Sequence, residues 1–252
     1  MNTEDIKLLQ GDCLELMKEI PEKSIDMILC DLPYGTTACT WDHIIPFDKL
    51  WYQYKRIRKN NAAIVLFGSE PFSSYLRMSN IKEYKYDWVW DKKQPTGFVN
   101  ANARPMKRHE LLSVFSNGSA TSTSCNMIYN PQGLLIYNKI TSYTSRGYLG
   151  ERESQEKRYI QKNTNYPNSI LSFSKDINKI HPTQKPVALL EYLIRTYTNE
   201  NMVILDNCMG SGSTGVACIN TKRKFIGIEL DQNYFNIAKK RIEDRLKQQE
   251  LF

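Results

Sequence analysis

The chain lacks any run of 18 consecutive apolar residues, and its first five residues are polar and partly acidic. A membrane-spanning helix needs about 20 predominantly apolar residues. A secretory signal needs a basic start that is followed by an apolar stretch. We therefore expect neither a membrane span nor a signal peptide, and we expect a cytoplasmic protein.

Paired cysteines are also missing. The chain has six cysteines, and no two of them form a C-x-x-C pair. Structural zinc sites usually contain such pairs. The sequence therefore predicts buried, reduced thiols and no metal site. The six are Cys13, Cys30, Cys39, Cys125, Cys208 and Cys218.

Positive charge is concentrated in the middle of the chain. Residues 81–185 contain 16 basic and 8 acidic residues, whereas the whole chain of 252 residues carries a formal net charge of +7. The excess therefore lies entirely in this region, which also interleaves tyrosines with the basic residues. That mixture suits a polyanion with stackable bases. An ordinary solvated surface with some core tyrosines remains the alternative.

Apolar runs alternate with helical patterns at both ends of the chain, within residues 1–116 and 181–252. Such alternation predicts an α/β fold with a parallel sheet and crossover helices. Residues 117–180 show no regular periodicity and start with a polar Ser/Thr stretch, so we expect an insertion there. The predicted strands are 6–10, 26–31, 62–67, 84–90, 111–115, 202–206 and 225–230. The predicted helices are 12–20, 47–59, 71–79, 187–198, 213–221 and 233–248.

A carboxylate, a proline and an aromatic ring follow the apolar run 25–30, in the order Asp31-Leu32-Pro33-Tyr34. The run is typical of a strand that is buried on both faces. Open α/β sheets bind ligands at the carboxyl ends of their strands. An acceptor and a flat ring at this place suit the amino group of a planar base. A helix N-cap is the alternative role for Asp31.

A glycine-rich turn follows a second apolar run, 203–206. Glycines let the backbone approach a ligand, and a helix N-terminus offers unpaired N–H groups. The next predicted strand ends at Glu229, whose carboxylate can accept both hydroxyls of a ribose. Turn, helix, strand and acid together indicate a nucleoside cofactor.

The spacing of Gly210, Gly212 and Gly215, with Glu229 further on, also satisfies the dinucleotide fingerprint of NAD enzymes. Asp206 argues against that reading, because an anion is poorly placed beside a pyrophosphate but well placed to pair with a cationic amino acid. In addition, only 23 residues follow Glu229, so most strands must come from the N-terminal part. A dehydrogenase and a loop that serves packing alone remain open alternatives.

The motif at residues 31–34, followed much later by 206–212, resembles the S-adenosylmethionine-dependent amino-methyltransferases of DNA, which methylate N6 of adenine or N4 of cytosine. The order, with the catalytic motif before the cofactor loop, is similar to the β class. The resemblance covers most of the chain except about 117–180. It implies a Rossmann-like methyltransferase fold with circularly permuted motif order. The fold is a doubly wound, mostly parallel seven-stranded sheet with a small inserted target-recognition region.

On this resemblance, residues 1–116 form the catalytic half, 117–180 the target-recognition insertion and 181–252 the half that binds S-adenosylmethionine. The implied catalytic residues are Asp31, Leu32, Pro33 and Tyr34. The implied cofactor-binding residues are Asp12, Cys13, Asp31, His181, Thr183, Lys185, Asp206, Cys208, Met209, Gly210, Ser211, Gly212, Ser213, Thr214, Glu229 and Leu230. The candidate DNA contacts are Arg104, Lys107, Arg108, Lys139 and Arg146.

Some of these residues have simpler alternative roles. Asp12 suits a helix N-cap, and His181 an ordinary loop position. The family usually has two prolines where this chain has Leu32-Pro33, and Leu32 can supply the same backbone acceptor. We expect 239–241, a run of three basic residues, on the solvated face of the last helix.

The resemblance predicts methyl transfer to N6 of adenine in double-stranded DNA, by base flipping and direct in-line transfer. Asp31 and the carbonyl of Leu32 would accept the N–H groups of the target amine. The alternatives are N4 of cytosine, an RNA target and a catalytically silent DNA-binding subunit. A homodimer and a cognate restriction endonuclease are the further expected partners. The recognition sequence cannot be read from the chain.

Overall fold

The computed structural model describes residues 3–35, 43–121, 126–144, 156–176 and 184–250. The chain forms two compact units. The larger unit comprises Met1–Asn130 and Ser169–Phe252, and the smaller unit comprises Pro131–Asn168. Among the helices described, none has the length and apolar character needed to cross a membrane.

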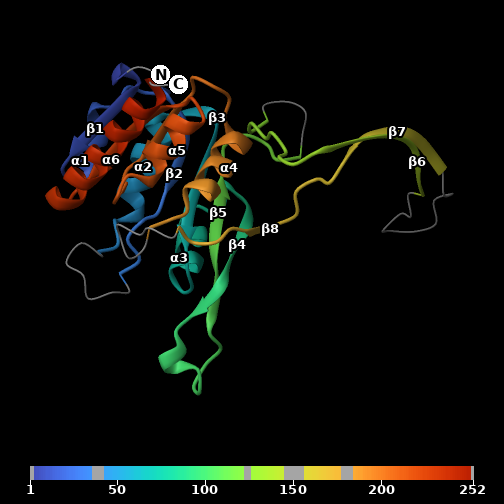
Figure 1. The fold of residues 1–252 in the computed structure, drawn as a ribbon, viewed down its shortest axis with the longest axis horizontal. Coiled ribbons are helices and arrows are strands. Elements are labelled where there is room, and N and C mark those ends of the chain that lie inside the picture. The colour runs from blue at the N-terminus through green and yellow to red at the C-terminus, as the bar shows by residue number, and fades with distance from the viewer. Residues whose placement is uncertain (1–2, 36–42, 122–125, 145–155, 177–183, 251–252) are drawn as a thin grey trace. The chain divides into compact units, whose positions relative to one another are not determined.

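The larger unit is built on one eight-stranded sheet with the order β1-β10-β9-β2-β3-β5-β4-β8 (Figure 1). Its strands are β1 (Ile6–Gln10), β2 (Ile25–Cys30), β3 (Arg58–Gly68), β4 (Tyr84–Thr96), β5 (Lys107–Phe115), β8 (Ile170–Ser172), β9 (Val203–Asp206) and β10 (Lys224–Glu229). Its α-helices are α1 (Cys13–Leu16), α2 (Phe47–Ile57), α3 (Phe72–Ser79), α4 (Val187–Tyr197), α5 (Ser213–Asn220) and α6 (Gln232–Glu250). Short 3-10 helices are η1 (Thr3–Asp5), η2 (Met17–Glu19) and η3 (Phe98–Asn100).

The sheet is mostly parallel. Strands β1, β10, β9, β2 and β3 run parallel to one another. Strand β5 is antiparallel to both β3 and β4, and β8 is parallel to β4. The predicted doubly wound α/β fold is therefore confirmed, although the sheet has eight strands and not seven. The additional strand, β8, has three residues, which is too short to leave a periodic signal in the sequence.

Helices cover both faces of the sheet. All six residues of β2 are buried, as expected of a central parallel strand. Met27 and Leu29 face a core that includes residues of α4, α5 and α6. Ile28 and Cys30 alternate with them and face a second core, formed with α2, α3 and the segment of α1 and η2. The sheet therefore separates two helical layers.

Segments far apart in the sequence complete one sheet. Strand β1 pairs with β10, and β2 pairs with β9, so the N-terminal and C-terminal parts of the chain fold together. The helix after β2 packs on one face of the sheet, whereas the helix after β9 packs on the other. The chain thus leaves these adjacent strands in opposite directions. Such a switch point opens a crevice at the carboxyl ends of the strands.

The smaller unit is an antiparallel pair of strands, β6 (Leu135–Thr144) and β7 (Glu156–Thr164). The side-chain amide of Asn165 donates to the carbonyl of Gly133 at 2.7 Å and joins the two ends of the pair. The predicted insertion, 117–180, is wider than this unit. Its described flanks, 117–121, 126–130 and 169–176, belong to the larger unit.

Candidate active site

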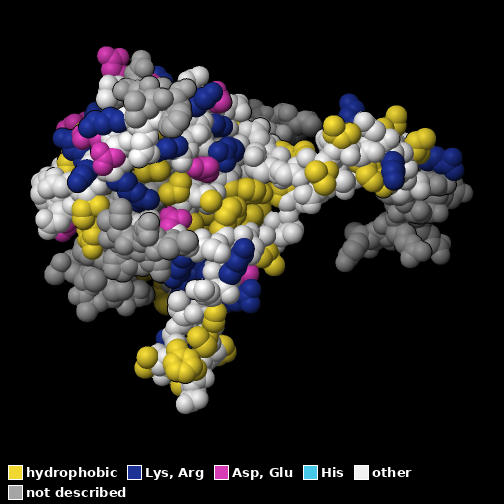
Figure 2. Space-filling model, viewed as in Figure 1, with side chains coloured by type: hydrophobic (Ala, Val, Ile, Leu, Met, Phe, Trp, Pro, Cys, Tyr) yellow, Lys and Arg dark blue, Asp and Glu magenta, His cyan; other side chains and the backbone are white. Residues whose placement is uncertain are grey.

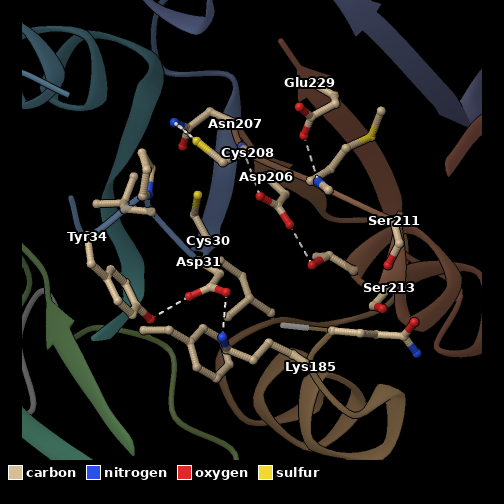
Figure 3. A pocket seen from close by; sticks show the side chains of 18 of the residues that line it. Cys30, Asp31, Tyr34, Lys185, Asp206, Asn207, Cys208, Ser211, Ser213 and Glu229 are labelled. Atoms are coloured by element: carbon tan, nitrogen blue, oxygen red, sulfur yellow. Dashed lines mark hydrogen bonds and ion pairs between the residues drawn. The ribbon is translucent and has the colours of Figure 1, made fainter. Parts of the chain in front are cut away.

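A cavity of about 560 Å³ opens at the carboxyl edge of the parallel strands in the larger unit. The segments that follow β1, β2, β9 and β10 line it, together with the residues that precede α4 (Figure 3). Its lining includes most of the predicted site residues. They are Asp12, Cys13, Asp31, Leu32, Pro33, Tyr34, Lys107, Lys185, Asp206, Cys208, Met209, Gly210, Ser211, Ser213, Thr214, Glu229 and Leu230.

Asp31 projects from the end of β2 and carries two partners. The hydroxyl of Tyr34 donates to its Oδ1 at 2.5 Å, and the ammonium group of Lys185 pairs with its Oδ2 (Figure 3). Burial raises the pKa of Tyr34 well above its usual value, and the charge of Asp31 adds to this effect. Tyr34 therefore stays a hydrogen-bond donor. No helix in the described part of the chain begins at Asp31.

The Lys185 ammonium group lies between two carboxylates. Its Nζ is 3.4 Å from Oε2 of Glu110 and 5.1 Å from the ring centre of Phe67. Burial opposes the charge on Lys185, but Asp31 and Glu110 outweigh it and raise the pKa. Burial likewise opposes the charge on Glu110, but Lys185 and Lys92 outweigh it and lower that pKa. Lys185 and Glu110 are both charged at neutral pH.

Sequence reasoning missed Glu110 and Lys92 as site residues. Glu110 alternates along β5 with the buried Leu112, and Lys92 alternates along β4 with the buried Trp90. Because side chains alternate between the faces of a strand, both polar groups lie on a core face. Nζ of Lys92 is 3.3 Å from Oε1 of Glu110. A charged residue in register with core positions was the available signal.

Asp206 is the most enclosed acid of the site. Its Oδ1 accepts the backbone N–H of Cys208 at 3.1 Å, and its Oδ2 accepts the hydroxyl of Thr214 at 2.6 Å. Burial raises the pKa of Asp206 to about 6, although these two hydrogen bonds act in the opposite direction. The charge of Asp206 therefore changes within the range of ordinary assay conditions.

Two glycines of the loop have different tasks. Gly210 has φ +51°, and a Cβ at this position would meet no atom within 4 Å. Gly212 has φ +77°, and its Cβ would lie 3.0 Å from Cβ of Ala238 in α6. Both need the left-handed region that favours glycine. Gly210 lines the cavity. Gly212, which is also predicted to bind cofactor, is not among the described lining residues, and it lets the loop pack closely on α6.

Glu229 and Asp12 are held by backbone N–H groups. Glu229 accepts N–H of Gly210 at 2.8 Å through Oε2 and N–H of Asp231 at 2.9 Å through Oε1. Burial raises its pKa. Oδ1 of Asp12 accepts N–H of Leu14 at 2.7 Å, so the N-cap role of Asp12 is confirmed, while the residue also lines the cavity. Carboxylate oxygens have about four acceptor positions, so each acid keeps capacity for a ligand.

Three thiols lie together beside the cavity: Cys13, Cys30 and Cys208. Cys30 and Cys208 point toward each other in Figure 3. Burial raises the pKa of Cys30 to about 12. A hydrogen bond with Cys208, together with burial, raises the pKa of Cys13. These groups are thiols at neutral pH and not nucleophilic thiolates. Of the remaining cysteines, Cys218 is buried, and 39 and 125 lie outside the described residues.

Arg241 corrects one expectation about the last helix. It was expected on the solvated face with 239 and 240, which are indeed exposed. Its guanidinium group instead donates to Oγ of Ser213 at 2.9 Å and to the carbonyl of Ser211 at 3.2 Å. Arg241 lies three residues after the buried Ala238, so helical spacing places it on the packed side. It ties α6 to the glycine loop.

The predicted DNA contacts lie in different parts of the structure. Arg104 is exposed between β4 and β5. Arg108 forms a two-pronged ion pair with Asp91, at 2.8 and 3.0 Å. This pair lowers the pKa of Asp91 to about 2. Lys139 belongs to the smaller unit, where its Nζ is 5.2 Å from the ring centre of Tyr137.

Lys107 lines the cavity, and its ammonium group contacts the hydroxyl of Ser69. Burial lowers the pKa of Lys107, and the neighbouring lysines Lys92 and Lys185 add to this effect. It is thus placed at the mouth of the site and not on a remote surface. Three predicted residues lie outside the described part of the chain: Arg146, His181 and Thr183.

Residues 25–240 match the DNA methylase family of N6 and N4 methyltransferases. The type II methyltransferase M.HinfI of Haemophilus influenzae is 29% identical over 94% of this chain and 68% of its own length. The DNA adenine methyltransferase YhdJ of Escherichia coli K12 is 25% identical over 94% of this chain and 82% of its own.

Solved structures show the same fold. The crystal structure of the M1.HpyAVI-SAM complex has a TM-score of 0.63 and 26% sequence identity, and covers 94% of this chain and 99% of that one. The PvuII DNA methyltransferase, which is cytosine-N4-specific, also has a TM-score of 0.63, at 16% identity, and covers 97% of this chain and 94% of that one. At this low identity the second likeness concerns the fold alone.

Proposed function

The chain belongs to the DNA methylase family, and on this premise we propose that it transfers a methyl group from S-adenosylmethionine to N6 of adenine in double-stranded DNA. The family makes it a DNA amino-methyltransferase that acts on adenine N6 or cytosine N4. One observation carries the proposal. Asp31, which is hydrogen-bonded to Tyr34, lines the same cavity as the glycine loop and Glu229, the last residue of β10.

The acids and the open space of the cavity fit S-adenosylmethionine. Glu229 would accept the ribose hydroxyls, as acids at the end of this strand do in nucleoside sites. Asp206 would pair with the α-amino cation. Gly210 leaves room for close approach of the ligand to the backbone, since a Cβ there would meet nothing within 4 Å. When bound, the cofactor supplies an electrophilic methyl group on a sulfonium ion.

The target amine is a poor nucleophile, because its lone pair is delocalised into the ring. In the proposed reaction, the carboxylate of Asp31 and the carbonyl of Leu32 accept its two N–H bonds. The nitrogen would then become more tetrahedral and bond to the methyl group as the S–CH₃ bond breaks, and the surplus N–H proton would leave through Asp31 to water. Acceleration comes from orientation and from acceptors that lie where positive charge develops. Since the three thiols stay protonated, none of them is proposed as a nucleophile.

Tyr34 has two tasks in this proposal. Its hydroxyl orients the carboxylate of Asp31, and its ring stacks on the base. The ring packs against Phe72, with the centroids 4.9 Å apart and the planes inclined by 31°, so its orientation is held from behind. A base in a duplex is paired and stacked, so the target must first be extruded, at a cost of a few kcal/mol.

Adenine is the proposed target for two reasons. Position 31 carries Asp and not Ser, which by resemblance to the family favours adenine, and the 25% identical YhdJ is a DNA adenine methyltransferase. Cytosine N4 is the enzymatic alternative, since its amine offers the same two N–H donors. The hydrogen-bonded pair of Asp31 and Tyr34 in an open cavity argues against a catalytically silent DNA-binding subunit.

The hairpin between β4 and β5 is a second place where we propose contact with DNA. Phe98 and Val99 at its end are 80% and 96% exposed, and Figure 2 shows apolar side chains there. Arg104 and Lys107 lie on the same hairpin. Apolar tips beside basic residues suit the minor groove of a kinked duplex.

The smaller unit would contribute Lys139 and, with the rest of the insertion, sequence recognition. A homodimer and a restriction endonuclease remain proposed partners.

Incubation with labelled S-adenosylmethionine and unmethylated duplex DNA tests the proposal. The DNA is digested to nucleosides, and the product is identified by mass. N6-methyladenine is the expected product. If the product is N4-methylcytosine, the target is cytosine and the adenine proposal is wrong. DNA binding without any methyl incorporation would favour the silent subunit.

A further inference from the structure

The acceptor that the target base needs already has a donor. Oδ1 of Asp31 accepts the hydroxyl of Tyr34, and Oδ2 is paired with the ammonium group of Lys185. An incoming amino group must therefore compete with a buried cation for the carboxylate. A cation also neutralises the negative charge that should stabilise the amine as it becomes positive. If Lys185 stayed on Asp31 during methyl transfer, it would therefore oppose the proposed reaction.

A second acceptor for Lys185 lies within reach. Oε2 of Glu110 is buried and already pairs with Nζ of Lys185 at 3.4 Å, which is longer than a good hydrogen bond. Oε1 of the same carboxylate is 3.3 Å from Nζ of Lys92. The long ion pair between Lys185 and Oε2 of Glu110 can shorten into a full charge-assisted hydrogen bond. Rotation of the terminal methylenes of Lys185 would bring its Nζ to this oxygen.

We propose that Lys185 is a positioning residue that exchanges partners when the target base enters. Before entry it pairs with Oδ2 of Asp31 and, at a longer distance, with Oε2 of Glu110. The exocyclic amine of the base then replaces it on Oδ2, and the ammonium group moves to Oε2 of Glu110. The ring of Phe67, 5.1 Å from Nζ, stays beside the cation throughout. This inference rests on the proposed function.

The exchange also favours bases that carry an amino group. Only a base with N–H donors can take the place of Lys185 on Oδ2 of Asp31, and a half-buried carboxylate that loses its cation without a replacement is disfavoured. A purine without the amine would leave Lys185 on Asp31. The part of the adenine-over-purine preference that depends on both Glu110 and Lys185 therefore reports the exchange.

A double-mutant cycle tests the exchange. The variants are Glu110→Gln, Lys185→Met and the two combined. The probes are duplexes with adenine or purine at the target position, in the sequence found by mapping the methylated adenine in duplex DNA, and S-adenosylhomocysteine is present. Glu110→Gln should lower the adenine-over-purine binding preference about tenfold when Lys185 is present, and less than about twofold in the Lys185→Met background. The same loss in both backgrounds, or no loss in either, would overturn the exchange.

Lys59→Met is the matched control. Lys59 also forms an ion pair with a buried acid, Asp26, at 2.7 Å, but neither residue lines the cavity. This variant should leave the adenine-over-purine preference unchanged. If the wild-type protein methylates adenine but the mutant cycle shows no coupling between Glu110 and Lys185, only the exchange is wrong. If the wild-type protein methylates no base, the proposed function is wrong as well.

A crystal structure of the wild-type protein with extruded adenine provides a second test, should Glu110→Gln fail to fold. Nζ of Lys185 should lie within about 3.2 Å of Oε2 of Glu110 and have left Oδ2 of Asp31. Lys185 still paired with Asp31 beside the bound amine would overturn the proposal.

Discussion

At the residue scale, three carboxylates at one edge of the sheet differ because their neighbours differ. Asp31 is paired with a cation, Asp206 is enclosed without one, and Glu229 accepts two backbone N–H groups. Burial, nearby charge and hydrogen bonding are the causes that shift the pKa of such groups. The same type of side chain can therefore polarise an amine, pair with a cation or hold a ribose.

Asp31→Ala should abolish methyl transfer while DNA and cofactor binding persist. The substitution removes an acceptor that acts on the developing charge, and loss of such a group costs about 10²–10³-fold in rate. Single-turnover methylation of duplex DNA measures the effect.

Asp26→Asn in the same strand is the control for that substitution. Asp26 is buried, but it pairs with Lys59 and accepts the N–H of Val203, away from the cavity. This variant should lose stability and keep its rate per folded molecule. A fully active Asp31→Ala variant would contradict the mechanism.

The raised pKa of Asp206 predicts pH-dependent cofactor binding. Pairing with a cationic amino group needs the ionised acid, so S-adenosylmethionine affinity should fall about tenfold per pH unit below about 6. Equilibrium dialysis between pH 5 and pH 8 measures this slope. Asp206→Asn should bind weakly and without that slope. An unchanged slope in the variant would assign the titration to another group.

The same group affects stability without ligand. Its folded pKa of about 6 lies above the value of 3.8 for an unperturbed Asp. Protonation therefore stabilises the folded protein fully below pH about 4, and this contribution is lost as the pH rises through about 6. Urea unfolding of the wild type and of Asp206→Asn between pH 4 and pH 7 should show the difference, with only the wild type carrying this contribution.

At the element scale, the glycine loop is shaped by the helices that follow it. Gly212 has no room for a Cβ beside Ala238, and Arg241 of α6 binds the loop through Ser211 and Ser213. The position of α6 therefore determines the position of the loop. Substitutions in α6 should affect cofactor binding, although α5 and β10 separate this helix from the glycine loop in the sequence.

Gly212→Ala should destabilise the protein more than Gly210→Ala. Both residues have positive φ, which costs a non-glycine residue about 1–2 kcal/mol. Only Gly212 adds overpacking, because its Cβ would lie 3.0 Å from Cβ and 3.1 Å from Cα of Ala238, at a further cost of about 1–3 kcal/mol. The free energy of unfolding in urea measures both. Equal losses of unfolding free energy in the two variants would show that α6 can move away from the new Cβ at no cost.

At the scale of the whole molecule, the larger unit contains all strands of the main sheet and every described residue that lines the cavity. The chain leaves and re-enters it at anchored points. The backbone N–H of Asn130 donates to the carbonyl of Thr196 at 2.7 Å, and the carbonyl of Ser169 accepts the N–H of Val89 at 2.8 Å. The described residues of the smaller unit contribute no strand to that sheet.

Replacement of 131–168 by a flexible Gly/Ser linker should therefore leave the fold and cofactor affinity nearly unchanged. Sequence-specific methylation should fall at least about 100-fold, because recognition contacts supply several kcal/mol. Thermal unfolding, cofactor titration and methylation of duplex DNA measure the three properties. Retained methylation at the original site would show that recognition lies elsewhere.

Much of the fold followed from local patterns. The apolar run before Asp31 indicated a strand buried on both faces, and all its residues are buried. The predicted helix 187–198 is α4, Val187–Tyr197, because its apolar residues recur at helical spacing. The strand Ile170–Ser172 was missed because three residues carry no period.

What the sequence determined by itself is the α/β class, the order of its motifs, the acid Asp31 directly after β2 and the acids that end β9 and β10. Each of these depends on the periodicity of a short segment or on a residue directly after it. Tertiary structure alone decided that Lys185 lies between Asp31 and Glu110 and that Arg241 holds the glycine loop. These contacts join residues 28 to 154 positions apart, and their energies depend on burial and on neighbouring charge, which no local pattern contains.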